Sequence, residues 1–319
     1  MGRIIIFNHI NRVTIANLYI CKMKKKLNIT ANTKGLFLML LGQLSFAIND
    51  TIVKYMVKLS ENDFSTLNII FIRGIFTSTL VFLIIIFFTK NNLKDLFLNK
   101  ISYLRGLFEV LTALFFFAGL VLMPMANVYT LLMTAPFIVT LYAFFFLNEK
   151  VGIRRWSAVI LGFVGVLIVI NPQNLEFGFL FILPIISAFF LTLRDVVTKE
   201  IANKNNSLDI TLITSLLVMV FSGIGAFFLN INIEFSNLIY IFISSLFLTS
   251  GYICSVLTII YAPLSLTASI RYSVIVFGII LGYLILGETP SLNMLLGAII
   301  ISASGLFVIK REKDLGKII

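Results

Sequence analysis

Two pairs of opposite charges lie inside long apolar stretches of this sequence, each an aspartate followed four residues later by a lysine. The pairs are Asp50 with Lys54 and Asp195 with Lys199. Residues four apart share one face of a helix, so each pair could simply neutralise itself. However, charge at the centre of a bilayer costs about 2.5–3.5 kcal/mol per residue. Because the same D-x-x-x-K pattern occurs in both halves of the chain, we interpret the pairs as functional charge clusters.

Two glutamates end apolar stretches at matching positions. Glu149 follows FFFLN in the first half, and Glu288 follows YLILG in the second. We expect Lys54 to meet Glu288 at one mouth of the protein and Lys199 to meet Glu149 at the other. Two such clusters that close in turn would form the gates of an alternating-access cycle.

Two arginines, Arg73 and Arg271, lie deep within apolar stretches and have no acid three or four residues away. An unpaired guanidinium in a cavity wall would favour a carboxylate or a phosphate through a bidentate contact. Two alternatives remain open, namely snorkelling to lipid headgroups and pairing with an acid on another helix. Arg105 and Glu109 stand four apart, and the sequence does not decide between a structural pair and a functional one.

Further binding candidates are polar or aromatic residues within the apolar stretches. Asn49 adjoins Asp50, and three tyrosines could offer rings and hydroxyls to a ring-bearing ligand, although packing is the common role of such residues. These tyrosines are Tyr129, Tyr142 and Tyr272. We expect no catalytic residue, metal site or cofactor, because His9 is the only histidine and the two cysteines, Cys21 and Cys254, lie far apart.

The elements that hold these residues are membrane-spanning helices. Of the 319 residues 59% are hydrophobic and only 12% charged, about half the charged fraction of a soluble domain. Apolar runs long enough to cross a bilayer recur along the chain, and they lack the alternation of barrel strands. We predict ten spans, at residues 35–57, 65–89, 101–122, 125–147, 153–170, 177–198, 208–229, 236–259, 264–286 and 291–309.

The basic residues predict the orientation. The net charge of +11 could suggest nucleic acid, but the lysines and arginines occupy short loops, as the positive-inside rule predicts, and we expect no nucleic-acid partner. With both termini in the cytoplasm, only Lys54 and Lys58 fall outside. Residues 1–34 form a cytoplasmic extension without a secretory signal, and translation could start at Met23, which would leave part of the extension untranslated.

An internal repeat predicts how the spans are organised. Residues 123–150 align with 262–289 without a gap at a constant offset of 139, and residues 49–54 align with 194–199. Each repeat holds five helices, so the second must be inserted upside down. We therefore predict two repeats, 35–172 and 176–311, followed by a cytoplasmic tail, 312–319.

Particular segments resemble a known family. FAINDTIVKY, FIRGIF, YLRGLF, FFLNEKVGIRRWSAVILGFVGVLIVINP and RYSVIVFGIILGYLILGETP look like the EamA family of the drug/metabolite transporter superfamily over residues 35–311. Within that family, the chain is most similar to bacterial uptake carriers for S-adenosylmethionine or riboflavin. The resemblance implies a ten-helix secondary transporter of the bacterial inner membrane with a central cavity between its halves.

We therefore expect a transporter of a small organic metabolite that is carboxylate-bearing, zwitterionic or ring-containing. No nucleotide-binding loop G-x-x-x-x-G-K-[ST] occurs, so transport would use a gradient or exchange. A membrane enzyme or lipid-handling protein is the alternative, and a structural subunit would leave the buried charges unexplained. Besides the substrate and the bilayer, a coupling ion or counter-substrate and a homodimer stay open as partners.

Overall fold

The protein is described by a computed structural model covering residues 33–59, 66–88, 100–135, 137–138, 141–142, 153–170, 178–201, 207–228, 237–262 and 270–314. Within these ranges every regular element is a helix, which confirms the all-helical prediction. The elements are the N-terminal helix Thr33–Leu59, α2 (Thr66–Phe88), α4 (Lys100–Leu122), α5 (Met125–Leu132), α7 (Ile153–Ile170), η1 (Gly178–Phe181), α8 (Ile182–Ile201), α9 (Ser207–Phe228), α10 (Leu238–Tyr261), α12 (Ser273–Leu286) and α13 (Leu292–Asp314).

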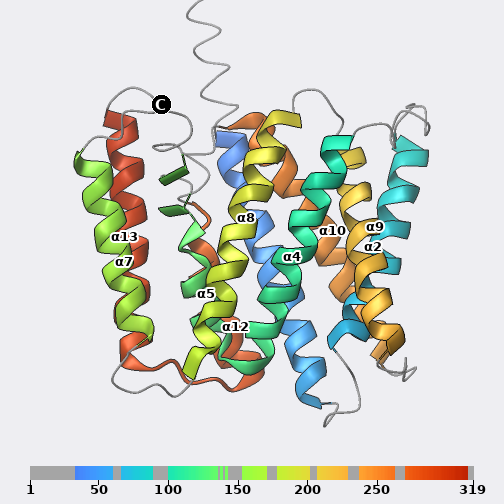
Figure 1. Cartoon of the computed structure of the whole chain (residues 1–319), viewed down its shortest axis with the longest axis horizontal. Coiled ribbons are helices and arrows are strands. Elements are labelled where there is room, and N and C mark those ends of the chain that lie inside the picture. Colours follow the sequence, from blue (N-terminus) through green and yellow to red (C-terminus); the bar gives the residue numbers. More distant parts are fainter. Residues whose placement is uncertain are drawn as a thin grey trace, which may run out of the picture.

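The helices stand side by side in one upright bundle. Figure 1 shows the α7 and α13 pair at one end of the long axis and the α2 and α9 pair at the other, with the remaining helices between them. Six of the described helices are long and apolar enough to cross a membrane, and they are the N-terminal helix, α2, α4, η1 with α8, α9 and α10. Shorter apolar helices, such as Ser273–Leu286 in α12, complete the bundle.

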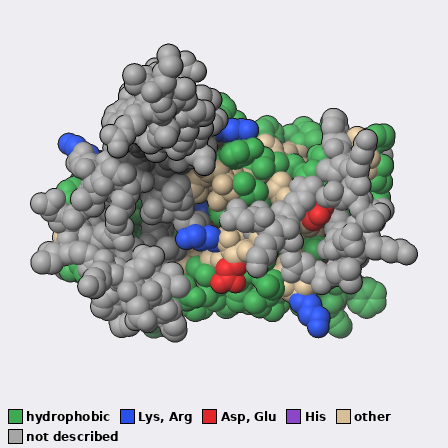
Figure 2. Space-filling model, turned by 90° about the horizontal axis from the view of Figure 1, so that it is seen from above, with side chains coloured by type: hydrophobic (Ala, Val, Ile, Leu, Met, Phe, Trp, Pro, Cys, Tyr) green, Lys and Arg blue, Asp and Glu red, His purple; other side chains and the backbone are tan. Residues whose placement is uncertain are grey.

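The outer surface of the bundle suits a lipid environment. Large apolar side chains are exposed along several helices, including Phe87, which is 75% exposed, and Leu284, which is 71% exposed. In the view onto one end of the bundle, hydrophobic side chains reach the visible margin and few charged ones are seen (Figure 2). Helices satisfy their own backbone hydrogen bonds, so such a bundle can tolerate a hydrocarbon surrounding.

Helices that occupy matching positions in the two predicted repeats pack against each other. The pairs are α2 with α9, α5 with α12 and α7 with α13. In the last pair the backbones come very close, because a Cβ added to Gly165 would lie 3.1 Å from the carbonyl oxygen of Gly297. Small residues at a helix contact allow such an approach.

Two of the predicted spans, 125–147 and 264–286, contain an interruption within the described residues. The helix α5 ends at Leu132 and is followed by a turn at residues 133–134, and α12 begins at Ser273 after a turn at 271–272. A proline clashes with the carbonyl four residues before it, and Pro136 therefore accounts for an end at Leu132. Residues 143–147 and 264–269 lie outside the described residues.

Candidate functional site

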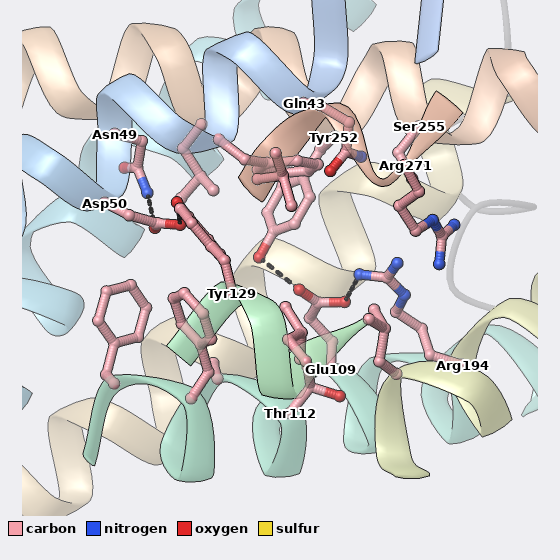
Figure 3. A pocket seen from close by; sticks show the side chains of 18 of the residues that line it. Gln43, Asn49, Asp50, Glu109, Thr112, Tyr129, Arg194, Tyr252, Ser255 and Arg271 are labelled. Atoms are coloured by element: carbon pink, nitrogen blue, oxygen red, sulfur yellow. Dashed lines mark hydrogen bonds and ion pairs between the residues drawn. The ribbon is translucent and has the colours of Figure 1, made fainter. Parts of the chain in front are cut away.

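A cavity lies at the centre of the bundle, where the interrupted helices meet the long ones. It contains about 740 Å³ of empty space, part of it open to solvent. Its lining comes from the N-terminal helix, α2, α4, α5, α8, α10 and α12. Figure 3 shows that polar side chains gather at two separate ends of this cavity.

At one end lies a group that we call the Asp50 cluster, made of Asn49, Asp50, Arg73, Tyr129 and Ser244. The Tyr129 hydroxyl donates to Asp50 Oδ2 at 2.7 Å, and Asn49 Nδ2 donates to Asp50 Oδ1 at 2.8 Å. The Asn49 amide oxygen accepts in turn from Arg73 at 3.1 Å and from Ser244 Oγ at 2.7 Å. The Arg73 guanidinium also lies over the Phe117 ring, 4.7 Å from its centroid.

At the other end lies the arginine cluster, made of Glu109, Arg194, Asp195, Tyr252 and Arg271. Arg194 donates to Glu109 Oε2 at 2.7 Å and, through two nitrogens, to Asp195 Oδ1 at 3.0 and 2.8 Å. Arg271 pairs with Asp195 Oδ2, and the Tyr252 hydroxyl donates to Glu109 Oε1 at 3.1 Å. These contacts join α4, α8, α10 and the turn before α12. Figure 3 shows Glu109 between Tyr252 and Arg194, with Arg271 nearby.

Most ion pairs inside the bundle join different helical segments, although the pair of Arg194 with Asp195 lies within α8. Asp195 contacts two arginines, whereas Lys199 is exposed on the same helix. Arg105 donates to the hydroxyls of Thr198 and Thr214, and its predicted neighbour Glu109 pairs with Arg194. Buried charges need several hydrogen-bond partners at once, and facing helices supply more of these than a single helix face.

Of the two arginines predicted to be unpaired, one forms an ion pair and the other does not, among the described residues. Arg271 forms an ion pair with Asp195 on α8. This confirms the alternative, a partner acid on another helix, and the prediction of an unpaired Arg271 guanidinium is wrong. Arg73 forms no ion pair among the described residues, and its contacts are Asn49 and the Phe117 ring. Each of the two keeps a buried Nε atom without a hydrogen-bond partner. Both therefore retain donor capacity in the cavity wall.

The three tyrosine candidates are placed differently. Tyr129 is buried and lines the cavity, stacked on Phe116 with ring centroids 5.8 Å apart. Its ring lies against α12, where a Cβ added to Gly278 would come within 2.3 Å of it, so this contact requires glycine. Tyr272 is buried and Tyr142 is half-buried, and neither lines this cavity.

One mouth of the bundle carries the expected contact between Lys54 and Glu288. The two side chains form an ion pair at 2.5 Å, and they are 12% and 19% exposed. Lys54 also donates to the Met123 carbonyl, while Glu288 Oε2 accepts from the backbone N–H of Met125 at 2.7 Å. The sharp turn before Glu288 is possible because Gly287 has φ = 69°, in the left-handed region.

These contacts join the N-terminal helix, the start of α5 and the segment between α12 and α13. Nearby, Lys58 donates to the Leu286 carbonyl at 2.9 Å. At the opposite mouth the predicted partner of Lys199, Glu149, lies outside the described residues. The contact between Lys199 and Glu149 therefore stays a prediction.

Sequence reasoning missed several cavity residues, among them Gln43, Thr112, Arg194, Tyr252 and Ser255. A signal for α10 was present in the sequence, since its polar residues recur every three or four positions at Ser245, Thr249, Tyr252, Ser255 and Thr258. Such spacing marks one helix face. It would have predicted that this face turns toward a polar interior.

Several known proteins are similar to this chain. The model of the EamA-like transporter family matches two segments, residues 33–171 and 177–310. The chain belongs to the EamA-like transporter family. It is 26% identical to an S-adenosylmethionine uptake transporter of Rickettsia bellii over 281 residues, which cover 88% of this chain and 94% of that one. It is 28% identical to a riboflavin transporter of Rhizobium johnstonii over 201 residues, which cover 61% and 65%.

A solved crystal structure shares the fold, with a TM-score of 0.64 at 11% identity over 90% of this chain and 98% of its own. The family and the relatives are transporters and not enzymes. The apolar helices agree with this, and the EamA-family chain is a multi-pass protein of the bacterial inner membrane that transports small metabolites.

Proposed function

We propose that this EamA-family chain is a secondary transporter that moves a small organic metabolite through the central cavity by alternating access. The main support for this proposal is the cavity. It holds charges of both signs and lies beside a mouth closed by the Lys54–Glu288 ion pair. Binding energy for a polar molecule is available in the middle of the bundle. A closed mouth on one side is what alternating access requires of each end state.

The substrate class follows from the lining. Arg73 and Arg271 keep free donor atoms that would suit a carboxylate, and Tyr129 with Phe116 offers aromatic faces to a ring. Asn49 and Asp50 add polar contacts at the opposite end from the arginine cluster. We infer a substrate that is carboxylate-bearing, zwitterionic or ring-containing.

The architecture behind this cycle is ten spans in two inverted repeats, 35–172 and 176–311, with both termini in the cytoplasm. In support, the family model matches two consecutive segments, and helices at matching positions pack in pairs. The interruptions also correspond, because 139 residues separate Met133 from Tyr272 and both lie in the turns. Short or broken helices at matching positions often flank transporter binding sites.

The proposed function is tested directly by measuring uptake of the two compounds in the relatives' names, S-adenosylmethionine and riboflavin. Purified protein reconstituted into liposomes should accumulate radiolabelled S-adenosylmethionine or riboflavin unchanged, above protein-free liposomes. Reconstituted Arg73→Ala protein serves as the control, because it should insert but lose uptake if the cavity is the pathway. Accumulation of neither compound would contradict this substrate class, and recovery of a chemically altered compound would favour a membrane enzyme.

The orientation is tested by thiol labelling in intact cells. With Cys21 and Cys254 replaced by serine, a cysteine at position 174 should react with an impermeant maleimide from outside, since residue 174 lies between the two repeats. A cysteine at position 317 should react only after the cells are permeabilised. The reverse pattern, or equal labelling of both sites, would rule out the inverted arrangement.

A further inference from the structure

The two aspartates of the D-x-x-x-K pattern are held in the same way in the two halves. Each Oδ1 accepts from the side chain of the residue just before it, which is Asn49 for Asp50 and Arg194 for Asp195. Each Oδ2 accepts from the interrupted helix region of its own half, from Tyr129 for Asp50 and from Arg271 for Asp195. The hydrogen-bond arrangement is thus shared.

The charges of these partners differ completely. Asp195 is held by two guanidinium groups, whereas Asp50 is held by an amide and a phenol, both neutral. Arg73 reaches Asp50 only through Asn49, whose oxygen it contacts at 3.1 Å. Among the described residues, no lysine or arginine forms an ion pair with Asp50. The charge of Asp195 is therefore neutralised by direct ion pairs, whereas Asp50 has no direct counter-charge among the described residues.

The surroundings of Asp50 suit a positively charged organic group. The carboxylate is only 6% exposed, yet it lines the cavity. The stacked rings of Phe116 and Tyr129 lie next to it, and Phe117 already holds one cation, the Arg73 guanidinium, against its face. A buried carboxylate without a counter-charge is costly, and aromatic faces attract cations. A bound cation would satisfy both features at once.

We propose that Asp50 binds the positive group of the transported molecule, an ammonium or sulfonium. At the far end of the cavity, the Nε atom of Arg271, which has no hydrogen-bond partner, would bind the negative group of that molecule. This inference rests on the proposed transport function and narrows its substrate class to molecules with separated charges. The proposal also makes different predictions for binding of the two compounds in the relatives' names. S-adenosylmethionine carries a sulfonium and an ammonium, and riboflavin carries no positive charge.

Asp50→Asn tests this assignment because asparagine keeps the size of the side chain and can still accept from Tyr129. Binding to purified full-length protein is measured by thermal stabilisation and by competition, with S-adenosylmethionine, its uncharged-sulfur analogue S-adenosylhomocysteine, lysine, glycine betaine and riboflavin. We expect at least one positively charged compound to bind, and its Kd to rise at least about tenfold in Asp50→Asn. Asp50→Glu, which keeps the charge, should lose less affinity.

Ser45→Ala provides the matched control on the same helix, because Ser45 contacts Ser250 outside the cavity lining and should bind as the wild type does. Binding of riboflavin alone, or of no positively charged compound, would overturn the assignment. So would an unchanged Kd in Asp50→Asn protein that elutes as a single folded species. If uptake into liposomes succeeds while these outcomes occur, the role of Asp50 fails and the transport function stands.

Discussion

Arg194→Met is expected to destabilise the protein by about 3–5 kcal/mol, the cost of leaving a buried charge without its partner. Arg194 is 5% exposed and is shared by two carboxylates, those of Glu109 and Asp195. Asp195 would keep Arg271, but among the described residues Glu109 would keep a hydrogen bond from the Tyr252 hydroxyl and no ion pair. Because this loss approaches the total stability of many proteins, little folded protein should be recovered. Thermal unfolding in detergent, followed by size-exclusion chromatography, measures it.

Two comparisons show whether the effect arises from the buried charge. Lys199→Gln removes a positive charge from an exposed position on the same helix, and its melting temperature should barely change. Adding Glu109→Gln to Arg194→Met should recover part of the stability, since a glutamine leaves no unpaired charge and can still bond Tyr252. Equal stability of Arg194→Met and wild type would mean that the arginine cluster does not hold α4, α8 and α12 together.

Lys54→Gln is expected to open the mouth that the Lys54–Glu288 pair closes. The pair is partly buried, so its loss should cost about 1 kcal/mol, which shifts a two-state conformational equilibrium about fivefold. The readout is the rate at which maleimide reaches a cysteine at Thr112, a residue of the cavity wall, when added from the Lys54 side. Native Cys21 and Cys254 are replaced by serine beforehand. The rate should rise in Lys54→Gln.

Lys58→Gln supplies the control for that rate. Lys58 lies one turn further along the N-terminal helix, is exposed, and contacts only the Leu286 carbonyl among the described residues. Its removal changes the charge at this mouth by the same amount, but it breaks no ion pair between described residues, so the rate should change less than about twofold. A slower reaction in Lys54→Gln, or the same acceleration in both variants, would contradict the gate assignment.

The helices themselves were predictable because length and apolar composition dictate a bilayer span, whatever the helix packs against. Thr33–Leu59, Lys100–Leu122 and Ser207–Phe228 begin and end within a few residues of their predicted positions. The interruption after Leu132 was less visible, since hydropathy continues unbroken through it. Pro136 carried the signal, through its clash with the carbonyl four residues earlier. No such residue marks the turn before Ser273.

The candidate site was predictable as a set of charges but not as a set of partners. Local spacing favoured Lys199 for Asp195 and Glu109 for Arg105. Instead, Asp195 pairs with its neighbour Arg194 and with Arg271, and Arg105 donates to Thr198 on another helix. Which face of α8 turns inward depends on its packing against the other helices of the bundle. Residue spacing within α8 alone does not predict that packing. Lys54 and Glu288 were the exception, because the internal repeat brought two helix ends together.

The central claim is that substrate crosses by alternate opening of two mouths, and locking one mouth tests it most directly. Cysteines at positions 54 and 288 are joined with a short, reducible bifunctional thiol reagent in reconstituted protein. S-adenosylmethionine uptake should fall below about a tenth of the uncrosslinked rate and recover on reduction, because a mouth held shut cannot exchange substrate. Uptake at the full rate in completely crosslinked protein would contradict the account.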